Sequence, residues 1–394
     1  LEQVRDKVLD KSLIAEKSIT KFFEAKELYL QRAKANLGQT VDNQTIDAGA
    51  GYGTYGIAEG MTELFNSFQS LSVSPTSTAE RQTVIFNAQK IADKIKTVDR
   101  RLGDLRTAIN DEVQNVIKDV NSKVKEIAFI AVNIGNIEVV EGSANEVRDA
   151  LQAAMETLSE YANISTSTND DGQLNVFLDG VQVITENVMT KSVTMHTDSN
   201  GMSFLADGDT GNIINLKSGF LKGMINARDV GVKDLRDKAN TLATQLITEV
   251  NTLHKTGYDL YGLNDSTAGL FTGTSAADMS VNAAIISDPR KLQGSSSATE
   301  VSNNDVIRSI AALSSKTITN LGGMTFNEYY GNTVSRFGQD LALSKSQLND
   351  QKTVQKMLER QRESIMGVSV DEEVANLVIY QRAFQASARL LKKY

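Results

Sequence analysis

A single apolar stripe through residues 77–137 constrains the fold more than any other feature of this sequence. Its side chains advance by threes and fours for about 60 residues without a proline, the periodicity of one face of an α-helix. Pro75 precedes the stripe, and Ser77 with Glu80 fits a capping box, in which each side chain satisfies the other residue's backbone N–H. The stripe consists of Val84, Ala88, Ile91, Ile95, Val98, Leu102, Leu105, Ile109, Val113, Val116, Val120, Val124, Ile127, Ala131 and Ile134. The predicted helix is roughly 90 Å long, which indicates a rod and not a compact enzyme.

Composition also favours long helices packed by aliphatic side chains. Apolar residues make up 40% of the 394 residues, but only 6% are aromatic, Trp is absent and there are 2 prolines. The net charge of −8 provides no basic footprint for nucleic acid. No run of 18 apolar residues and no signal-peptide pattern occurs, so we predict neither a membrane span nor a cleavable signal. The absence of cysteine excludes disulfides, thiolate nucleophiles and Cys-type metal sites.

Helical periodicity marks both ends of the chain, and a different pattern separates them. Residues 163–217 contain short alternating runs bounded by hairpin turn sequences such as Asp179-Gly180 and Asn200-Gly201, which predicts an antiparallel β insert. One-sided apolar helices need neighbours, since each buried Leu or Ile stabilises by roughly 1.5–3 kcal/mol. The predicted fold is mainly α with a β insert: an elongated antiparallel helical bundle, or coiled-coil-like rod, made from the N- and C-terminal segments, plus a small antiparallel β-rich subdomain.

Five regions follow from these patterns. The expected strands of the insert are 173–178, 181–188, 192–197, 202–206 and 212–216. The predicted regions are the N-terminal part of the rod (1–162), the β-rich insert (163–217), a helix returning to the rod (218–257), an irregular mixed segment (258–303) and the C-terminal part of the rod (304–394).

No group of side chains indicates catalysis. We expect His196 at an exposed sheet position and His254 as a cation near the C-terminus of its helix. Residues 259–265 lack the spacing of a calcium loop and predict a polar turn, while Gly49–Gly53 lacks the Lys-Ser/Thr of a phosphate cradle and predicts a flexible loop. The acidic cluster 371–373 lies in the first turn of a predicted helix, where the helix dipole favours it. The sequence therefore predicts no enzyme, no cofactor and no metal.

The last predicted helix carries the most specific motif. Tyr380 and Phe384 form an aromatic (i, i+4) pair that we expect to be buried, either within this chain or against another subunit. The stretch from Gly367 to Ala388 closely resembles the C-terminal motif of the bacterial flagellar hook-associated protein 1 family. The candidate assembly and packing residues are the matching positions Gly367, Asp371, Glu372, Glu373, Asn376, Leu377, Tyr380, Gln381, Ala383, Phe384, Ala386 and Ala388.

Two further segments resemble the same family. The run from Phe65 to Pro75, followed by Ala79-Glu-Arg81, is similar to its F-x-x-L-x-x-L-x-x-x-P-x-x-x-x-x-R segment, and residues 270–277 resemble its segment after the inserted domain. The family's extreme N-terminal helix is missing and the C-terminal helix stops short of its usual end, so we expect a fragment of a longer protein. The middle of the chain is short, so a large outer domain is not expected.

The resemblance implies a structural role at the junction of the flagellar hook and filament, outside the cell, after flagellar type III export. The implied partners are the hook protein, a second hook–filament junction protein, further copies in a ring and an export chaperone for the C-terminal region, with no nucleic acid or membrane. Two alternatives stay open. A flagellin-like filament subunit would share the bundle without the C-terminal motif, and a secreted adhesin or binding module would work through the β insert.

Overall fold

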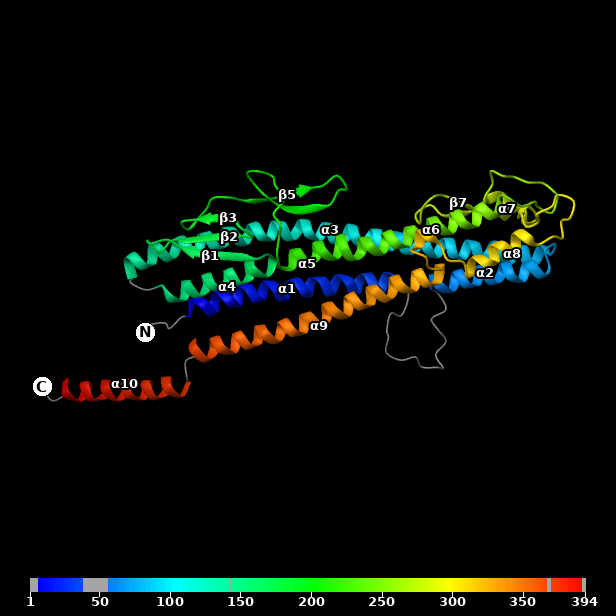
Figure 1. Cartoon of the computed structure of the whole chain (residues 1–394). Coiled ribbons are helices and arrows are strands. Elements are labelled where there is room, and N and C mark those ends of the chain that lie inside the picture. Colours follow the sequence, from blue (N-terminus) through cyan, green and yellow to red (C-terminus); the bar gives the residue numbers. More distant parts are fainter. Residues whose placement is uncertain (1–5, 38–55, 142–143, 367–369, 392–394) are drawn as a thin grey trace.

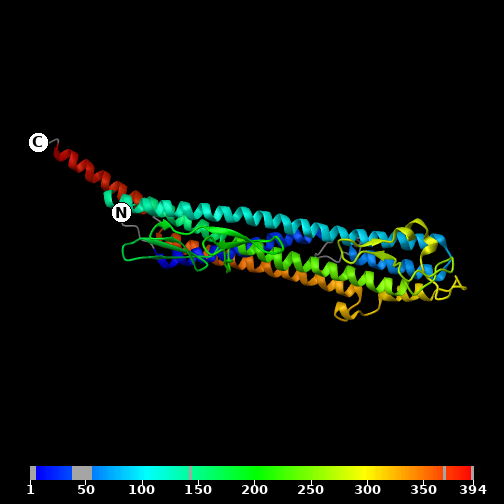
Figure 2. The same cartoon turned by 90° about the horizontal axis from the view of Figure 1, so that it is seen from above.

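The chain forms an elongated rod of antiparallel helices with β structure on one flank (Figure 1; Figure 2). The computed structural model describes residues 6–37, 56–141, 144–366 and 370–391. The main helices of the rod are α1 (Lys7–Asn36), α2 (Ile57–Val73), α3 (Thr78–Glu141), α4 (Asn145–Tyr161), α6 (Lys233–His254) and α9 (Phe326–Met366). The predicted fold class, a helical rod from both ends of the chain with a β insert, is confirmed.

The longest element is α3, whose 64 residues span roughly 95 Å. Every residue of the predicted stripe is buried except Ile134, which is half-buried. Along its length α3 packs in turn against α2, α6 and α4, so its apolar stripe contacts another helix over most of its length (Figure 1). At its start, the Ser77 Oγ accepts from the Glu80 N–H at 3.3 Å. The Ser77 N–H instead donates to the Ser74 carbonyl, so the reciprocal half of the predicted capping box is wrong.

The β region consists of two separate antiparallel sheets. One contains β1 (Ile164–Thr168), β2 (Leu174–Leu178), β3 (Val181–Thr185) and β4 (Val188–Met189) in sequence order, and the other contains β5 (Val193–Thr197) and β6 (Ser203–Asp207). The β2–β3 turn places Asp179 at φ 45° and Gly180 at φ 93°, as an Asp-Gly hairpin turn requires. The expected strand at 212–216 is wrong, because only an isolated Ala206–Ile213 bridge forms there.

A π-helical turn, η1 (Ala227–Val232), joins α5 (Phe220–Asn226) to α6. Two glycines let α1 approach this region closely. A Cβ at Gly223 would lie 2.3 Å from the Phe22 carbonyl oxygen, and one at Gly231 would lie 2.4 Å from a Leu30 methyl carbon. A side chain at position 223 would therefore push α1 away from α5, whereas one at position 231 would require the Leu30 side chain to move.

Residues 257–325 cover the end of the rod where α2 and α3 meet (Figure 1). Its elements are β7 (Phe271–Thr272), β8 (Ser280–Val281), α7 (Ala283–Ser287), η2 (Pro289–Lys291), α8 (Asp305–Ala311), η3 (Ala312–Ser314) and η4 (Thr319–Leu321). Leu270, Ile307 and Ile310 are among the buried side chains that join this segment to the core.

The two C-terminal helices differ in their packing. α9 lies along α1, α2 and α6, with Phe337, Ser344 and Leu348 of its predicted seam buried. The predicted apolar face of α9 is less buried toward its C-terminus, where Ile365 is 40% exposed. α10 (Val370–Leu391) lies beyond the other end of the rod (Figure 1; Figure 2). No described helix has the length and apolar content that crossing a membrane requires.

Candidate assembly sites

The candidate assembly motif lies on α10, outside the body of the rod. Gly367 and the side chains of Asp371, Glu372, Glu373 and Asn376 fall outside the described part of the chain. The other motif residues all lie on α10 with exposed side chains, namely Leu377, Tyr380, Gln381, Ala383, Phe384, Ala386 and Ala388. The described part of the motif is therefore open on the surface.

The aromatic pair of α10 faces solvent. Tyr380 and Phe384 are each 75% exposed, so the first of the two expected alternatives, burial within this chain, is wrong, and burial against another subunit stays a prediction. The neighbouring Leu377 and Ile379 are 64% and 62% exposed. A helix that is apolar on several sides is typical of one buried by neighbours. The exposed side chains of α10 thus form a surface suited to another polypeptide.

Arg81, in one of the family-like segments, fixes the start of α3 to the segment that covers this end of the rod. Its side chain is buried, its Nε donates to the Pro75 carbonyl at 2.9 Å, and its Nη1 donates to the Leu292 carbonyl. Burial lowers the pKa of Arg81 to about 10, against the opposing effect of Asp259. The guanidinium therefore stays charged at neutral pH and joins two backbone segments that are remote in sequence.

The family-like segment 270–277 is held at the same end by two asparagines of α6. The Asn251 amide donates to the Phe271 carbonyl at 2.9 Å and accepts from the Phe271 N–H at 3.0 Å. The Asn240 Oδ1 accepts from the Ala276 N–H at 2.9 Å. These contacts give the segment a structural role in closing the end of the rod.

His254 is a neutral core residue. It is fully buried, its Nε2 accepts from the Gln293 N–H at 3.1 Å, and its Nδ1 lies 3.2 Å from the Ala268 carbonyl oxygen. Burial lowers the pKa of His254 to about 4. The expectation of a cation is therefore wrong, because desolvation outweighs the attraction of the helix C-terminus. His196 is exposed on β5, as predicted.

The segment 259–265 forms a polar turn. The Asp259 Oδ1 accepts from the N–H groups of Tyr261 and Leu263 at 2.8 and 2.9 Å, which confirms the predicted polar turn. Within the described ranges, no three His, Asp or Glu side chains come together as a metal site. The predicted flexible loop at Gly49–Gly53 lies outside the described residues.

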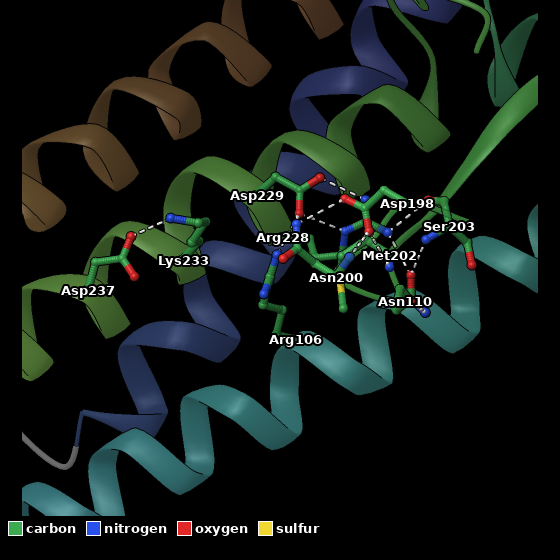
Figure 3. A network of polar contacts seen from close by, with 11 residues as sticks. Arg106, Asn110, Asp198, Asn200, Met202, Ser203, Arg228, Asp229, Lys233 and Asp237 are labelled. Atoms are coloured by element: carbon green, nitrogen blue, oxygen red, sulfur yellow. Dashed lines mark hydrogen bonds and ion pairs between the residues drawn. The ribbon is translucent and has the colours of Figure 1, made fainter. Parts of the chain in front are cut away.

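Arg228 is the centre of a polar network that attaches the β5–β6 hairpin to the rod (Figure 3). The π-helical turn places this fully buried guanidinium beside the hairpin. Its Nη1 donates to the Asn110 Oδ1 at 2.8 Å and to the Ser203 carbonyl at 2.9 Å. Its Nε and Nη2 donate to the two carboxylate oxygens of Asp229 at 2.9 and 2.7 Å. The guanidinium also lies 4.7 Å above the Phe204 ring.

Amide side chains of α3 complete the attachment. The Asn110 Oδ1 accepts from the Ser203 N–H at 2.7 Å, and the Gln114 amide donates to the Ser203 Oγ at 3.1 Å. Farther along, Asn121 accepts from the Val193 N–H at 2.9 Å and donates to its carbonyl at 2.6 Å. These bonds satisfy backbone groups of β5 and β6 with side chains of the rod.

The position of Arg228 in the sequence is itself a signal for this network. Arg228 stands at an inward helical position between Met224 and Leu235, where the seam would otherwise place an apolar residue. A charge on the buried face of a helix predicts a paired or hydrogen-bonded group.

A second buried charge cluster joins α9 to α1 and α4. The two carboxylate oxygens of Glu156 accept from the Lys17 Nζ at 2.5 Å and the Arg362 Nη1 at 2.5 Å, and the Gln152 amide donates to one of them at 3.1 Å. Burial disfavours ionisation, but the hydrogen bonds and the two cations outweigh it, so the pKa of Glu156 is lowered. The Arg362–Glu156 ion pair thus joins the C-terminal part of α9 to α4.

The sequence matches two known protein families. Residues 44–271 match the family described as "Flagellar hook-associated protein FlgK helical domain", and residues 354–394 match "Flagellar basal body rod FlgEFG protein C-terminal". The second match covers the end of α9 and the motif of α10. Fold and matches together define a structural protein of the bacterial flagellum. The first match covers more than half of the chain, and the chain belongs to the flagellar hook-associated protein FlgK family.

Relatives from distant bacteria agree with this assignment. The chain is 23% identical to flagellar hook-associated protein 1 of Escherichia coli, over 86% of this chain and 79% of the relative. It is 20% identical to the protein of that name in Bacillus subtilis, over 99% of this chain and 82% of the relative. The flagellar hook junction protein FlgK of Burkholderia pseudomallei has a similar fold, with a TM-score of 0.57 and 19% identity over 66% of this chain and 46% of that chain. This chain is a structural component of the flagellar hook–filament junction, and the flagellin-like and adhesin alternatives are not favoured.

Proposed function

We propose that this chain joins the flagellar hook to the filament mechanically, by packing against neighbouring subunits around the flagellar axis, and that it catalyses no reaction. The observation that carries this proposal is the exposed apolar surface of α10 at one end of a rod whose longest helix, α3, buries its apolar stripe. A rigid rod with an uncovered helix at one end is suited to heterologous contacts that repeat from copy to copy.

The proposed partners follow from family membership and from that surface. They are the hook protein, a second hook–filament junction protein, further copies of this chain in a ring, and an export chaperone for the C-terminal region. The proposed location is the extracellular flagellum, reached through the flagellar export apparatus. The candidate residues of the Gly367–Ala388 motif act in this proposal through packing, and its large apolar side chains Leu377, Tyr380 and Phe384 are 64%, 75% and 75% exposed.

Deletion of the gene tests the junction role. We expect cells without it to carry hooks that lack filaments and to release unpolymerised flagellin into the medium. Electron microscopy of the cells and an immunoblot of the medium would measure both effects, and return of the gene should restore the filaments. Normal filaments in the deletion strain would contradict the proposal.

A further inference from the structure

The inward face of α9 changes from apolar to polar halfway along the helix. Buried or half-buried side chains recur on this face at intervals of four and three residues, at Phe337, Leu341, Ser344, Leu348, Gln351, Gln355, Leu358 and Arg362. Three of the four positions after Leu348 are polar, and no described side chain from 349 to 365 is buried. Figure 1 shows α9 diverging from α1 toward the C-terminal end of α9. This part of α9 therefore buries little apolar surface against the rod.

The polar side chains on this face make few bonds to the rest of the rod. The Gln351 Oε1 is buried without a hydrogen-bond partner, which costs free energy because the atom has lost its water. The Gln355 amide donates to Glu359 of the same helix at 2.9 Å. Among the described residues from 349 to 365, only Arg362 has a hydrogen bond or ion pair to another element, and its partner is Glu156 of α4. One ion pair therefore provides the polar attachment of this part of α9.

Glu156 keeps a partner on each carboxylate oxygen when Arg362 leaves. Its Oε2 accepts from Lys17 of α1 at 2.5 Å, and its Oε1 accepts from the Gln152 amide at 3.1 Å as well as from Arg362. Loss of one partner from a buried ion pair is normally costly, because it leaves a buried charge uncompensated. Here Lys17 still compensates the carboxylate, and the Arg362 side chain, already 28% exposed, gains water. Separation of Arg362 from Glu156 therefore costs less free energy than separation of an isolated buried pair.

We infer that residues 349–366 of α9 form a latch that opens when Arg362 leaves Glu156: this part of the helix then moves away from α1 and α4 while the rest of the rod stays folded. Leu348 is the last side chain of α9 that is buried among the described residues, so the hinge lies directly after it. Residues 349–366 lead into α10, so opening changes where the motif of α10 lies relative to the rod. The latch thereby gives that motif a range of positions from which to contact a partner. This last step rests on the proposed function, whereas the opening itself does not.

Spin-label distances test the latch on the full chain, because a chain without cysteine takes labels only at introduced sites. One pair joins Ala153→Cys on α4 to Gln361→Cys on α9, and both sites are exposed. The reference pair joins Ala153→Cys to Gln339→Cys, an exposed site of α9 before the hinge. We expect Arg362→Gln to lengthen and broaden the 153–361 distance distribution, measured by double electron–electron resonance, and to leave the 153–339 distribution unchanged.

A matched control separates the latch from a general loss of stability. Arg360→Gln removes an exposed arginine two residues away on the same helix, and it should leave both distance distributions as they are in the native chain. The thermal midpoint of Arg362→Gln should equal that of the native chain, because the carboxylate of Glu156 keeps its other two partners.

A closed variant tests whether opening serves assembly. Gln351→Leu combined with Gln355→Leu makes the inward face apolar, so it should narrow and shorten the 153–361 distribution, even when Arg362→Gln is added. In cells that carry this variant in place of the native gene, we expect a loss of filaments from hooks, counted by electron microscopy, because the motif of α10 stays in one position.

The outcomes separate the latch from the junction role. An unchanged 153–361 distribution in Arg362→Gln would overturn the latch, and so would a 153–339 distribution that lengthens with it, because the whole helix would then leave the rod. Normal filaments in the closed variant, with its 153–361 distribution narrowed, would overturn the role of opening in assembly. The junction role fails separately, if the native gene does not restore filaments to the deletion strain.

Discussion

The stripe of α3 and the motif of α10 have similar apolar patterns but opposite surroundings. Ile95 and Leu102 of α3 are fully buried, whereas Tyr380 and Phe384 of α10 are each 75% exposed. α3 lies against α2, α4 and α6 along its length, and α10 extends beyond the end of the rod (Figure 1). Helical periodicity therefore predicts that a face will be covered, but it does not predict whether the same chain supplies the cover.

The difference separates stability from assembly. Burial of the α3 stripe is part of the free energy that holds one copy together, because those side chains leave water when the chain folds. The exposed side chains of α10 contribute little of this free energy, and their apolar area is still available for a contact between chains. The same substitution should accordingly have different effects in the two helices.

The largest effect is expected from a cavity in the covered helix. Leu102→Ala should lower the free energy of unfolding by about 2–5 kcal/mol, because it removes packed methyl groups from a fully buried site. Urea unfolding followed by circular dichroism would measure the loss. Leu377→Ala is the matched control, since its site on α10 is 64% exposed, and it should leave the midpoint unchanged. Equal losses in the two variants would show that the two leucines are equally covered.

The fold is predictable from the sequence where local pattern and packing agree. The long helices of the rod repeat an apolar face over many turns, and the Asp179-Gly180 turn specifies its own backbone conformation. β1 is not predicted, because Ile164 is its only apolar residue and its pairing with β2 defines it. The expected strand at 212–216 is wrong although its residues are apolar, because a single Ala206–Ile213 bridge forms there and no partner strand pairs with the whole segment.

The sites are less predictable, because they depend on contacts between remote segments. The environment of His254 is completed by Ala268 and Gln293, which no local pattern brings together with the end of α6. The network of Arg228 likewise needs Asn110 of α3 and Ser203 of β6. The motif of α10 could be identified by resemblance, but its exposure could not, because sequence similarity does not say which surface a helix meets.

A smaller loss of stability is expected at acidic pH, from His254 at the end of the rod that residues 257–325 cover. The pKa of His254 is lowered by burial from 6.5 to about 4 in the folded chain, so the unfolded chain binds a proton first as the pH falls. Stability should therefore be lost between pH 6.5 and pH 4, by about 3 kcal/mol for this group. The measurement is the free energy of unfolding as a function of pH.

A His254→Gln variant separates this contribution from that of carboxylates that titrate in the same pH range. Glutamine keeps hydrogen-bonding capacity without the titration, so the stability difference between the native chain and the variant should shrink as the pH falls from 6.5 to 4. A difference that stays constant over that range would show that His254 does not titrate as a buried neutral group.

The smallest effect on stability, and the largest on assembly, is expected from the uncovered aromatic pair. Phe384→Ala should change the free energy of unfolding by less than about 0.5 kcal/mol, because the ring is exposed and loses few contacts. It should nevertheless reduce filament attachment and motility, since the contact between subunits would lose an aromatic side chain. Phe86→Ala is the matched control, with a ring 63% exposed on α3, and it should alter neither property. If Phe384→Ala cells swim normally and the chain is as stable as before, α10 does not act through this residue. If the isolated chain is instead destabilised by several kcal/mol, the Phe384 ring is buried within the chain, and the distinction between α3 and α10 fails.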